Sequence, residues 1–98
     1  MTRQATFHRL AEVELFDAAQ YYLSVEPILA ERFVAAVEEA RDQLLIHPEM
    51  APLVSRGVRR KIVNGFPYAV FYSIQAEGIR ILAIGHQRRR PSFWRGRR

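Results

Sequence analysis

The sequence predicts an α+β fold with the element order β-α-α-β-β-β, in which an antiparallel sheet packs against a two-helix hairpin. Apolar residues recur at helical spacing through most of the first half, and they alternate or form short runs through the second half. Prolines and glycines mark the changes from one pattern to the next. The 98 residues suffice for one compact domain, and we expect residues 1–98 to form a single one.

The first half begins with an alternating segment over residues 3–9, which predicts a strand at or near a sheet edge with one buried side. An amphipathic helix is predicted over residues 11–24, because apolar residues there follow helical spacing and acidic residues fill the first turns. Pro27 suits the first position of a second helix, which Pro48 ends. Since only residues 25–26 separate the two helices, we expect an antiparallel hairpin.

The second half changes to strand patterns after a loop that contains Pro48, Pro52 and Gly57. Asn64 and Gly65 suit a tight turn between two strands. The nearly continuous apolar run that follows predicts a central strand, covered by the helices on one face and by loops or a partner on the other. The predicted strands are residues 58–63, 68–74 and 79–84.

The charge of the chain is divided between its halves. Residues 1–50 carry four basic and nine acidic residues, whereas residues 51–98 carry eleven basic residues and Glu77 alone. The resulting net charges of −5 and +10 indicate an anionic partner, either nucleic acid or an acidic polypeptide. Of the 15 basic residues only Lys61 is a lysine, which favours recognition of carboxylates or phosphates by planar guanidinium groups.

The residue inventory excludes several classes of site. The chain has no cysteine and three widely spaced histidines, so we expect no metal site and no cofactor. Serines and glycines form neither a nucleophile elbow nor a phosphate-binding loop. We interpret Glu12, Glu14, Glu38 and Glu39 as exposed residues of the helices. Without an apolar run of membrane-spanning length, or a signal-peptide core after Met1, we expect a cytoplasmic protein with no membrane contact.

The end of the chain, a basic tail from about residue 86, is the predicted working surface. It combines arginines with His86, Phe93 and Trp94, and the two aromatic residues can pack on a protein groove or stack on a base. Because this tail follows the last strand and carries few core positions, we expect removal of residues 93–98 to spare the fold and weaken the function. The alternative is a structural Trp94 that packs back on the helices.

One catalytic possibility fits the inventory, the cleavage of RNA without a metal. That reaction needs a group that activates the 2′-hydroxyl, a cation for the phosphorane charge and a proton donor for the leaving oxygen. His86, Arg60, Arg88 and Arg89 offer such groups. The alternative interpretations are a strand-end histidine with a structural hydrogen bond and a solvated arginine tail.

Segments along essentially the whole chain resemble the ParE/RelE toxin superfamily, and most of all its ParE branch. The most specific are the Phe-Pro-Tyr strand and the terminal combination of histidine, arginine, proline and tryptophan. The resemblance is carried by Tyr21, Tyr22, Phe33, Val37, Pro48, Arg59, Arg60, residues 66–72, residues 81–84, residues 86–91, Trp94 and Arg97. The family has the same element order that periodicity predicts.

The resemblance implies a toxin of a type II toxin-antitoxin system, encoded beside a ParD-like antitoxin. Antitoxins of this kind wrap the toxin with an extended segment, dock a helix in an apolar groove and often add a strand to the sheet. Such a partner would also neutralise the basic half of the chain. RelE-like members cleave mRNA on the ribosome, whereas characterised ParE-like members poison DNA gyrase.

The residues at the positions implied by the resemblance disfavour RelE-type cleavage. RelE-like enzymes use an arginine where this chain has Ala69, and an arginine and a tyrosine where it has Gln87 and Phe93. Arg60 matches one basic residue of their second strand, while Ile62 replaces another. Cleavage would then depend on His86 as an acid or base, as it does on histidine in some relatives.

Our leading hypothesis is a toxin that acts by binding and inhibits DNA gyrase. The expected target-binding residues are Arg59, Arg60, Arg88, Arg89, Arg90, Trp94 and Arg95. The alternatives are a ribosome-dependent mRNA endoribonuclease that uses His86 with Arg60 and Arg88 or Arg89, and a family member that binds antitoxin but is weakly toxic.

Overall fold

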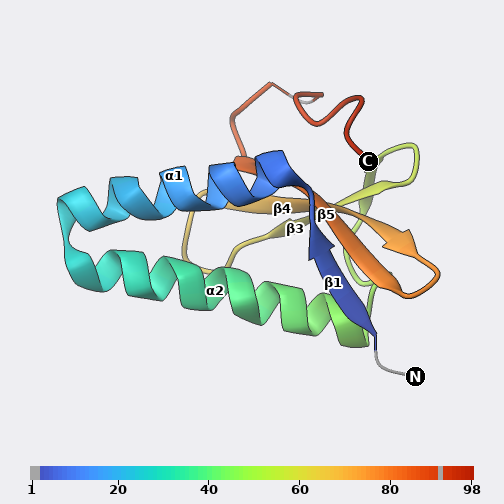
Figure 1. The fold of residues 1–98 in the computed structure, drawn as a ribbon, viewed down its shortest axis with the longest axis horizontal. Coiled ribbons are helices and arrows are strands. Elements are labelled where there is room, and N and C mark those ends of the chain that lie inside the picture. The colour runs from blue at the N-terminus through green and yellow to red at the C-terminus, as the bar shows by residue number, and fades with distance from the viewer. Residues whose placement is uncertain (1–2, 91) are drawn as a thin grey trace.

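Two long helices lie side by side along one face of a five-stranded sheet in the computed structural model, which describes residues 3–90 and 92–98 (Figure 1). The predicted order is confirmed, with one short extra strand, β2, inside the predicted loop. Met1, which entered the signal-peptide argument, and Pro91 of the terminal motif lie outside the described residues. The elements are β1 (Gln4–Phe7), α1 (Arg9–Val25), α2 (Pro27–Ile46), β2 (Leu53–Ser55), β3 (Val58–Ile62), β4 (Tyr68–Gln75) and β5 (Gly78–His86).

The sheet is mixed, with the strand order β1-β5-β4-β3-β2. β1 is an edge strand and β4 is the central one, as predicted. The expectation of a wholly antiparallel sheet is wrong for one pair, because β1 runs parallel to β5 while the other neighbours are antiparallel. This pairing places the first strand beside the last one. Arg80 of β5 also connects them, because its Nη1 donates to the carbonyl oxygen of Phe7 at 3.1 Å.

The helices begin and end where capping chemistry allows. His8 lies before α1 in an extended conformation, and its Nδ1 accepts a hydrogen bond from the Leu10 amide at 3.0 Å, so the helix begins at Arg9. Glu26 alone separates the helices, and Pro27 opens α2. Among the described residues, no helix is both long and apolar enough to cross a membrane.

The connection between β3 and β4 is longer than the predicted tight turn. Residues 63–67 form it, with Gly65 at a positive φ of 84°. The extra length places the Phe66 ring 5.0 Å from that of Tyr22 and 5.2 Å from that of Phe33, at the end of the helical hairpin. The aromatic packing of Phe66 therefore replaces the tight turn expected at Asn64 and Gly65.

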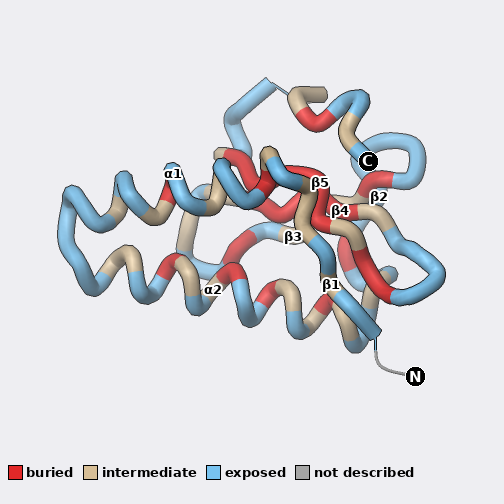
Figure 2. The backbone as a smooth tube through the Cα atoms, viewed as in Figure 1, coloured by how far each residue is buried: buried red, intermediate tan, exposed pale blue. Residues whose placement is uncertain are grey.

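The main core lies between the helices and the sheet, where buried segments of both face each other (Figure 2). Tyr72 of β4 is fully buried in it and donates its hydroxyl hydrogen to the Pro48 carbonyl oxygen at 2.6 Å. Burial raises the pKa of Tyr72, although the nearby Arg59 guanidinium acts in the opposite direction. The largest fully buried residues of this core are Tyr72, Phe33, Leu44, Ile79, Ile81, Ile84, Val37, Val63 and Val70.

A β-bulge in β5 changes which face the end of this strand presents. Phe71 pairs with Ala83, but the next residue of β4, Tyr72, pairs with Ile81, so Leu82 is the extra residue. Leu82 and Ala83 both belong to a cluster on the face away from the helices, whereas Ile81 and Ile84 belong to the main core. Because of the bulge, the residues after Ala83, including His86, lie on the opposite face from the one that the alternation in the first part of β5 predicts.

Candidate functional site

Residues 92–98, here called the C-terminal segment, pack through Trp94 on the sheet face opposite the helices. The Trp94 indole stacks on Phe71 with ring centroids 4.4 Å apart, and only 7% of the residue is exposed. Trp94 completes a second buried cluster with Val58, Ala69, Phe71, Leu82 and Ala83. Trp94 is the one buried residue of this segment, and the alternative of a structural Trp94 is right about its burial but wrong about its place, because it packs on the sheet and not on the helices.

Glu14 of α1 fixes the C-terminal segment to the rest of the molecule. Its two carboxylate oxygens accept hydrogen bonds from Nη1 and Nη2 of Arg97 at 2.8 and 3.0 Å. The same carboxylate accepts from Arg89 at 3.3 Å and from the Ile84 amide at 3.1 Å. The interpretation of Glu14 as an exposed helix residue is wrong, because its side chain is only 13% exposed and that of Arg97 11%.

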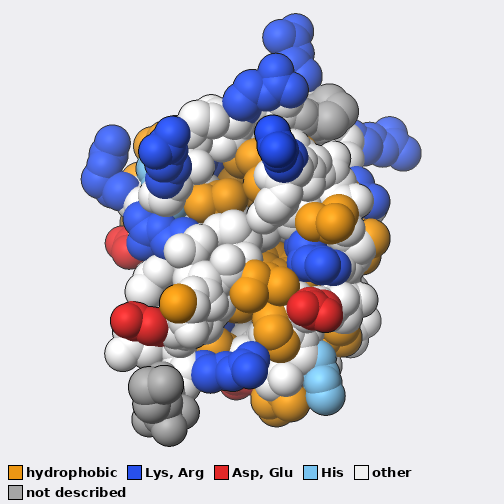
Figure 3. Space-filling model, turned by 90° about the vertical axis from the view of Figure 1, so that its right-hand side faces the viewer, with side chains coloured by type: hydrophobic (Ala, Val, Ile, Leu, Met, Phe, Trp, Pro, Cys, Tyr) orange, Lys and Arg blue, Asp and Glu red, His pale blue; other side chains and the backbone are white. Residues whose placement is uncertain are grey.

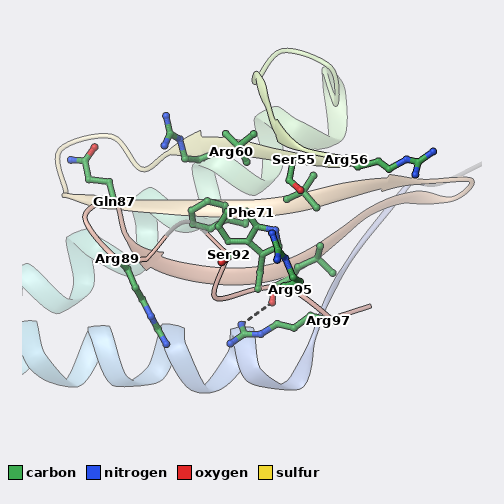
Figure 4. Close-up of a pocket in the computed structure, with 14 residues that line it drawn as sticks. Ser55, Arg56, Arg60, Phe71, Gln87, Arg89, Ser92, Arg95 and Arg97 are labelled. Carbon is green, nitrogen blue, oxygen red and sulfur yellow. Dashed lines mark hydrogen bonds between the residues drawn. The ribbon is translucent and has the colours of Figure 1, made fainter.

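A cavity of about 450 Å³ lies between the C-terminal segment and β2 and β3 (Figure 4). We call it the basic cavity, because five arginines and no acidic residue line it. In Figure 4 the arginines lie on several sides of Phe71. Lys and Arg side chains also surround hydrophobic ones on the face seen in Figure 3. The lining residues are Val54, Ser55, Arg56, Val58, Arg60, Phe71, Leu82, Gln87, Arg89, Ser92, Trp94, Arg95, Gly96 and Arg97.

The five arginines of the cavity divide into engaged and unengaged groups. Arg97 and Arg89 bind Glu14, and the Arg89 guanidinium also lies 4.2 Å from the centre of the Phe93 ring. Among the described residues, the side chains of the other three make no hydrogen bond or ion pair. These three are Arg56, Arg60 and Arg95, and Nε of Arg60 is buried without a hydrogen-bond partner in that part of the chain. Unlike Arg89 and Arg97, they have no acceptor in the described structure.

The remaining arginines of the predicted target-binding set lie elsewhere. Arg59 donates from Nη1 to the Ala51 carbonyl at 2.7 Å and the Glu49 carbonyl at 3.3 Å, so it holds the loop after α2. Arg88 and Arg90 are exposed between β5 and the C-terminal segment. The structure therefore brings four predicted residues to the basic cavity, namely Arg60, Arg89, Trp94 and Arg95.

His86 lines a different cavity, of about 240 Å³, with Tyr68, Ile84 and the α1 residues Glu14 and Asp17. Its Nδ1 accepts a hydrogen bond from the Arg88 amide at 3.1 Å. Arg60 lines the basic cavity and is not among the described residues that line the cavity of His86, so neither of these two cavities gathers all the groups of the nuclease alternative. Of the described lining residues, Arg89 alone is common to both cavities.

Sequence reasoning missed several residues of this site. Ser55 lines the cavity from β2, a strand that the loop composition did not reveal, and Arg56 lines it from the turn that follows. Glu14 reaches Arg97 across 83 residues of sequence. No local pattern signals such contacts. Within residues 3–90 and 92–98, no three His, Asp or Glu side chains come close enough together to hold a metal ion.

A comparison with known families finds a match over most of the chain. A sequence profile described as ParE toxin of type II toxin-antitoxin system, parDE, matches residues 5–91. The chain belongs to the ParE toxin family. In this ParE-family chain the matched residues cover both helices, the sheet and the arginine run of residues 88–90, and they end before the C-terminal segment.

A solved structure supports the fold of this ParE-family chain. A chain described as the chromosomal ParDE TA system from P. aeruginosa matches with a TM-score of 0.74 and 21% sequence identity. The match covers 87% of this chain and 96% of that chain. A comparison with curated proteins found no match. At this identity the likeness establishes the architecture alone.

Proposed function

We propose that this chain is the toxin of a type II toxin-antitoxin pair, that it acts by binding and inhibiting DNA gyrase, and that a cognate ParD-like antitoxin neutralises it. The observation that carries the proposal is the membership in the ParE toxin family over residues 5–91. Two features of the structure support it, an apolar groove on the helix side and a basic surface at the C-terminal end.

The groove suits an antitoxin helix. It measures about 270 Å³ between α1, α2 and β1, and Phe7, Leu15, Val34 and Val37 provide its apolar lining. Acidic and basic side chains also line it, as expected where the apolar face of an amphipathic helix meets a groove with polar margins. β1 and β2 are the two edges of the sheet, and each has a side on which a further strand can pair.

The positions where RelE-like enzymes carry catalytic groups support binding over catalysis. Ala69 is fully buried, Gln87 is uncharged, and the Phe93 ring is packed against Phe71 and Trp94. His86, the alternative acid or base, lines another cavity than Arg60. A phosphoryl-transfer site needs its base, acid and cation around one reacting phosphate.

The exposed arginines are the proposed gyrase contacts. The side chains of Arg88 and Arg90 are exposed and make no hydrogen bond or ion pair within residues 3–90 and 92–98, and Arg60, Arg89 and Arg95 extend that surface into the basic cavity. Trp94 and Arg59 contribute indirectly, because the first is buried under the C-terminal segment and the second holds a loop.

A supercoiling assay with purified gyrase tests the proposal. The chain should inhibit supercoiling at micromolar concentration, and added antitoxin should restore it. Replacing both Arg88 and Arg90 with Gln should weaken inhibition about tenfold, which corresponds to about 1.4 kcal/mol of binding free energy. Arg32→Gln, an exposed change on α2, is the matched control and should have no effect. Full supercoiling activity of gyrase in the presence of micromolar toxin would show that gyrase is not the target.

Two further measurements distinguish the alternatives. Cleavage of translated mRNA in primer extension, abolished by His86→Ala, would establish the endoribonuclease in place of the gyrase inhibitor. Unimpeded growth of bacteria that express the chain without antitoxin would show a family member with weak toxicity.

A further inference from the structure

The basic cavity has the chemistry of a site for a polyanion. We propose that it binds backbone phosphates of a nucleic acid strand. This goes beyond inhibition of the gyrase protein, because it gives the toxin a direct contact with nucleic acid. The proposal rests on the arrangement of unengaged guanidinium groups, on the buried Nε of Arg60 and on the aromatic packing beneath the cavity.

The cavity carries excess positive charge. Arg56, Arg60 and Arg95 line it without an acidic neighbour in the lining. Among the described residues, the carboxylate that accepts hydrogen bonds from lining arginines is that of Glu14, and Arg97 binds it with both of its terminal nitrogens. Since charge of one sign in a concave site with low-dielectric walls concentrates counter-ions, the cavity attracts anions.

Arg60 supplies a specific donor group. Its Nε is buried and has no acceptor among the described residues, an arrangement that is unfavourable unless a ligand or a small side-chain rotation satisfies it. Nε–H and one terminal N–H of a guanidinium form a fork that matches two oxygens of a phosphate. A rotation about the terminal torsions of Arg60 that turns this fork to the cavity would give the donor an anionic partner.

The surroundings favour a phosphate backbone over bases and over a single carboxylate. Phe71 and Trp94 are stacked on each other and buried, so they present no open ring face on which a base can stack. Ser55, Ser92 and Gln87 line the cavity with hydroxyl and amide donors, the groups that commonly contact phosphate and sugar. The arginines lie on different sides of the cavity, which suits charges repeated along a strand (Figure 4).

Trp94 makes the site directly measurable. It is the single tryptophan of the chain and lines the cavity, so its fluorescence reports occupancy. Titration of the purified full chain with a single-stranded oligothymidylate should give a saturable fluorescence change. The affinity should fall with salt on a log-log slope of about −0.7 for each phosphate contacted, or about −2 for three arginines.

Variants connect the effect to the cavity. Arg60→Gln should lower the affinity and reduce the magnitude of the salt slope by about 0.7, a change that a purely structural role would not produce. Arg95→Gln, at an exposed position, should do the same and serves if the Arg60 variant unfolds. Arg32→Gln on α2 is the control and should leave both the affinity and the slope unchanged.

The competing ligands give opposite outcomes. Equal affinity for a DNA and an RNA oligonucleotide of the same length, independent of base sequence, supports backbone binding. Tighter binding of a glutamate-rich peptide of the same charge would overturn the proposal in favour of an acidic polypeptide. A flat fluorescence titration, or a salt slope unchanged in both variants, would also overturn it. Because the assay contains no gyrase, its failure is distinct from failure of the proposed target.

Discussion

The two faces of the sheet are covered by different means. One face is covered by helices of 17 and 20 residues, which bury a large core around Phe33, Leu44 and Tyr72. The other is covered by the short C-terminal segment, which buries a small cluster around Phe71 and Trp94. Since hydrophobic stabilisation scales with apolar area removed from water, the helix side provides most of the stability, and the other side holds an arginine-rich surface in position.

The attachment of the C-terminal segment depends on few contacts. Its backbone makes turn hydrogen bonds, such as that from the Arg97 amide to the Trp94 carbonyl at 3.0 Å, and it does not pair with the sheet as a strand. Side-chain contacts carry the attachment: the Trp94 stack, the Glu14 ion pair to Arg97, and two hydrogen bonds to β5, from Arg97 to the Leu82 carbonyl at 3.1 Å and from Arg80 to the Arg98 carbonyl at 3.2 Å. A segment held in this way is expected to open more readily than the helices.

The largest expected effect is on the helix side. Phe33→Ala should lower the free energy of unfolding by about 4 kcal/mol, because it leaves a cavity in the main core. Denaturant unfolding measures this, and all spectroscopic probes should shift together. Phe16→Ala on α1 is the control, because that side chain is 62% exposed and its loss should cost less than about 0.5 kcal/mol.

The next effect concerns the opposite face. Trp94→Ala should cost about 3 kcal/mol, since the indole is buried against Phe71. Hydrogen exchange should show lost protection in the C-terminal segment and in β3, with α1 and α2 protected as before. Removal of residues 93–98 should act in the same direction. Equal loss of protection in the helices would mean that the two faces unfold as one unit.

A smaller effect is expected at the ion pair. Glu14→Gln should cost about 2 kcal/mol, because Arg97 is left largely buried beside a neutral amide. Asp42→Asn is the matched control. Its partner Arg41, with a side chain 34% exposed, lies 3.0 Å away, and this pair at the surface should contribute less than about 1 kcal/mol. Thermal or denaturant unfolding compares the two variants, and similar losses would contradict the role assigned to Glu14.

The smallest effect is a pH dependence on the helix side. Because burial raises the pKa of Tyr72 in the folded state, the folded state favours the protonated phenol. This contribution to stability is fully present below about pH 10, the pKa of an ordinary tyrosine, and is lost as the pH rises through the raised value. Tyr72→Phe should reduce that loss. It should also remove the hydrogen bond to Pro48, which lowers the free energy of unfolding by about 1 kcal/mol. Denaturant unfolding of both proteins between about pH 8 and pH 11 measures the difference.

Local patterns predicted most of the architecture. Pro27, Pro48 and the helical spacing between them placed α2 within two residues, since proline geometry and amphipathic burial act within a few turns. The apolar run that became β4 identified the central strand for the same reason. The parallel pairing of β1 with β5 was not predictable, because it joins strands that lie more than 70 residues apart.

The candidate site was predicted in composition more than in arrangement. The basic C-terminal residues and the family resemblance indicated an anion-binding toxin surface, and charge and residue type are properties of the sequence. Which arginines are engaged was not predictable. Arg89 and Arg97 are engaged by Glu14, which the sequence presents as an ordinary exposed helix residue. The Phe93 ring, over which Arg89 lies, packs closely on Gly85, where a Cβ would collide with it.

Periodicity, composition and charge were enough to predict one α+β domain with an acidic helical half and a basic strand-rich half. Tertiary packing assigned the roles within the basic half. The bulge at Leu82 separates His86 from Arg60, and the return of Trp94 to the sheet converts an apparent tail into one wall of a cavity. Both effects arise from contacts between residues distant in sequence, whose free energy depends on the assembled sheet and not on local conformational preference.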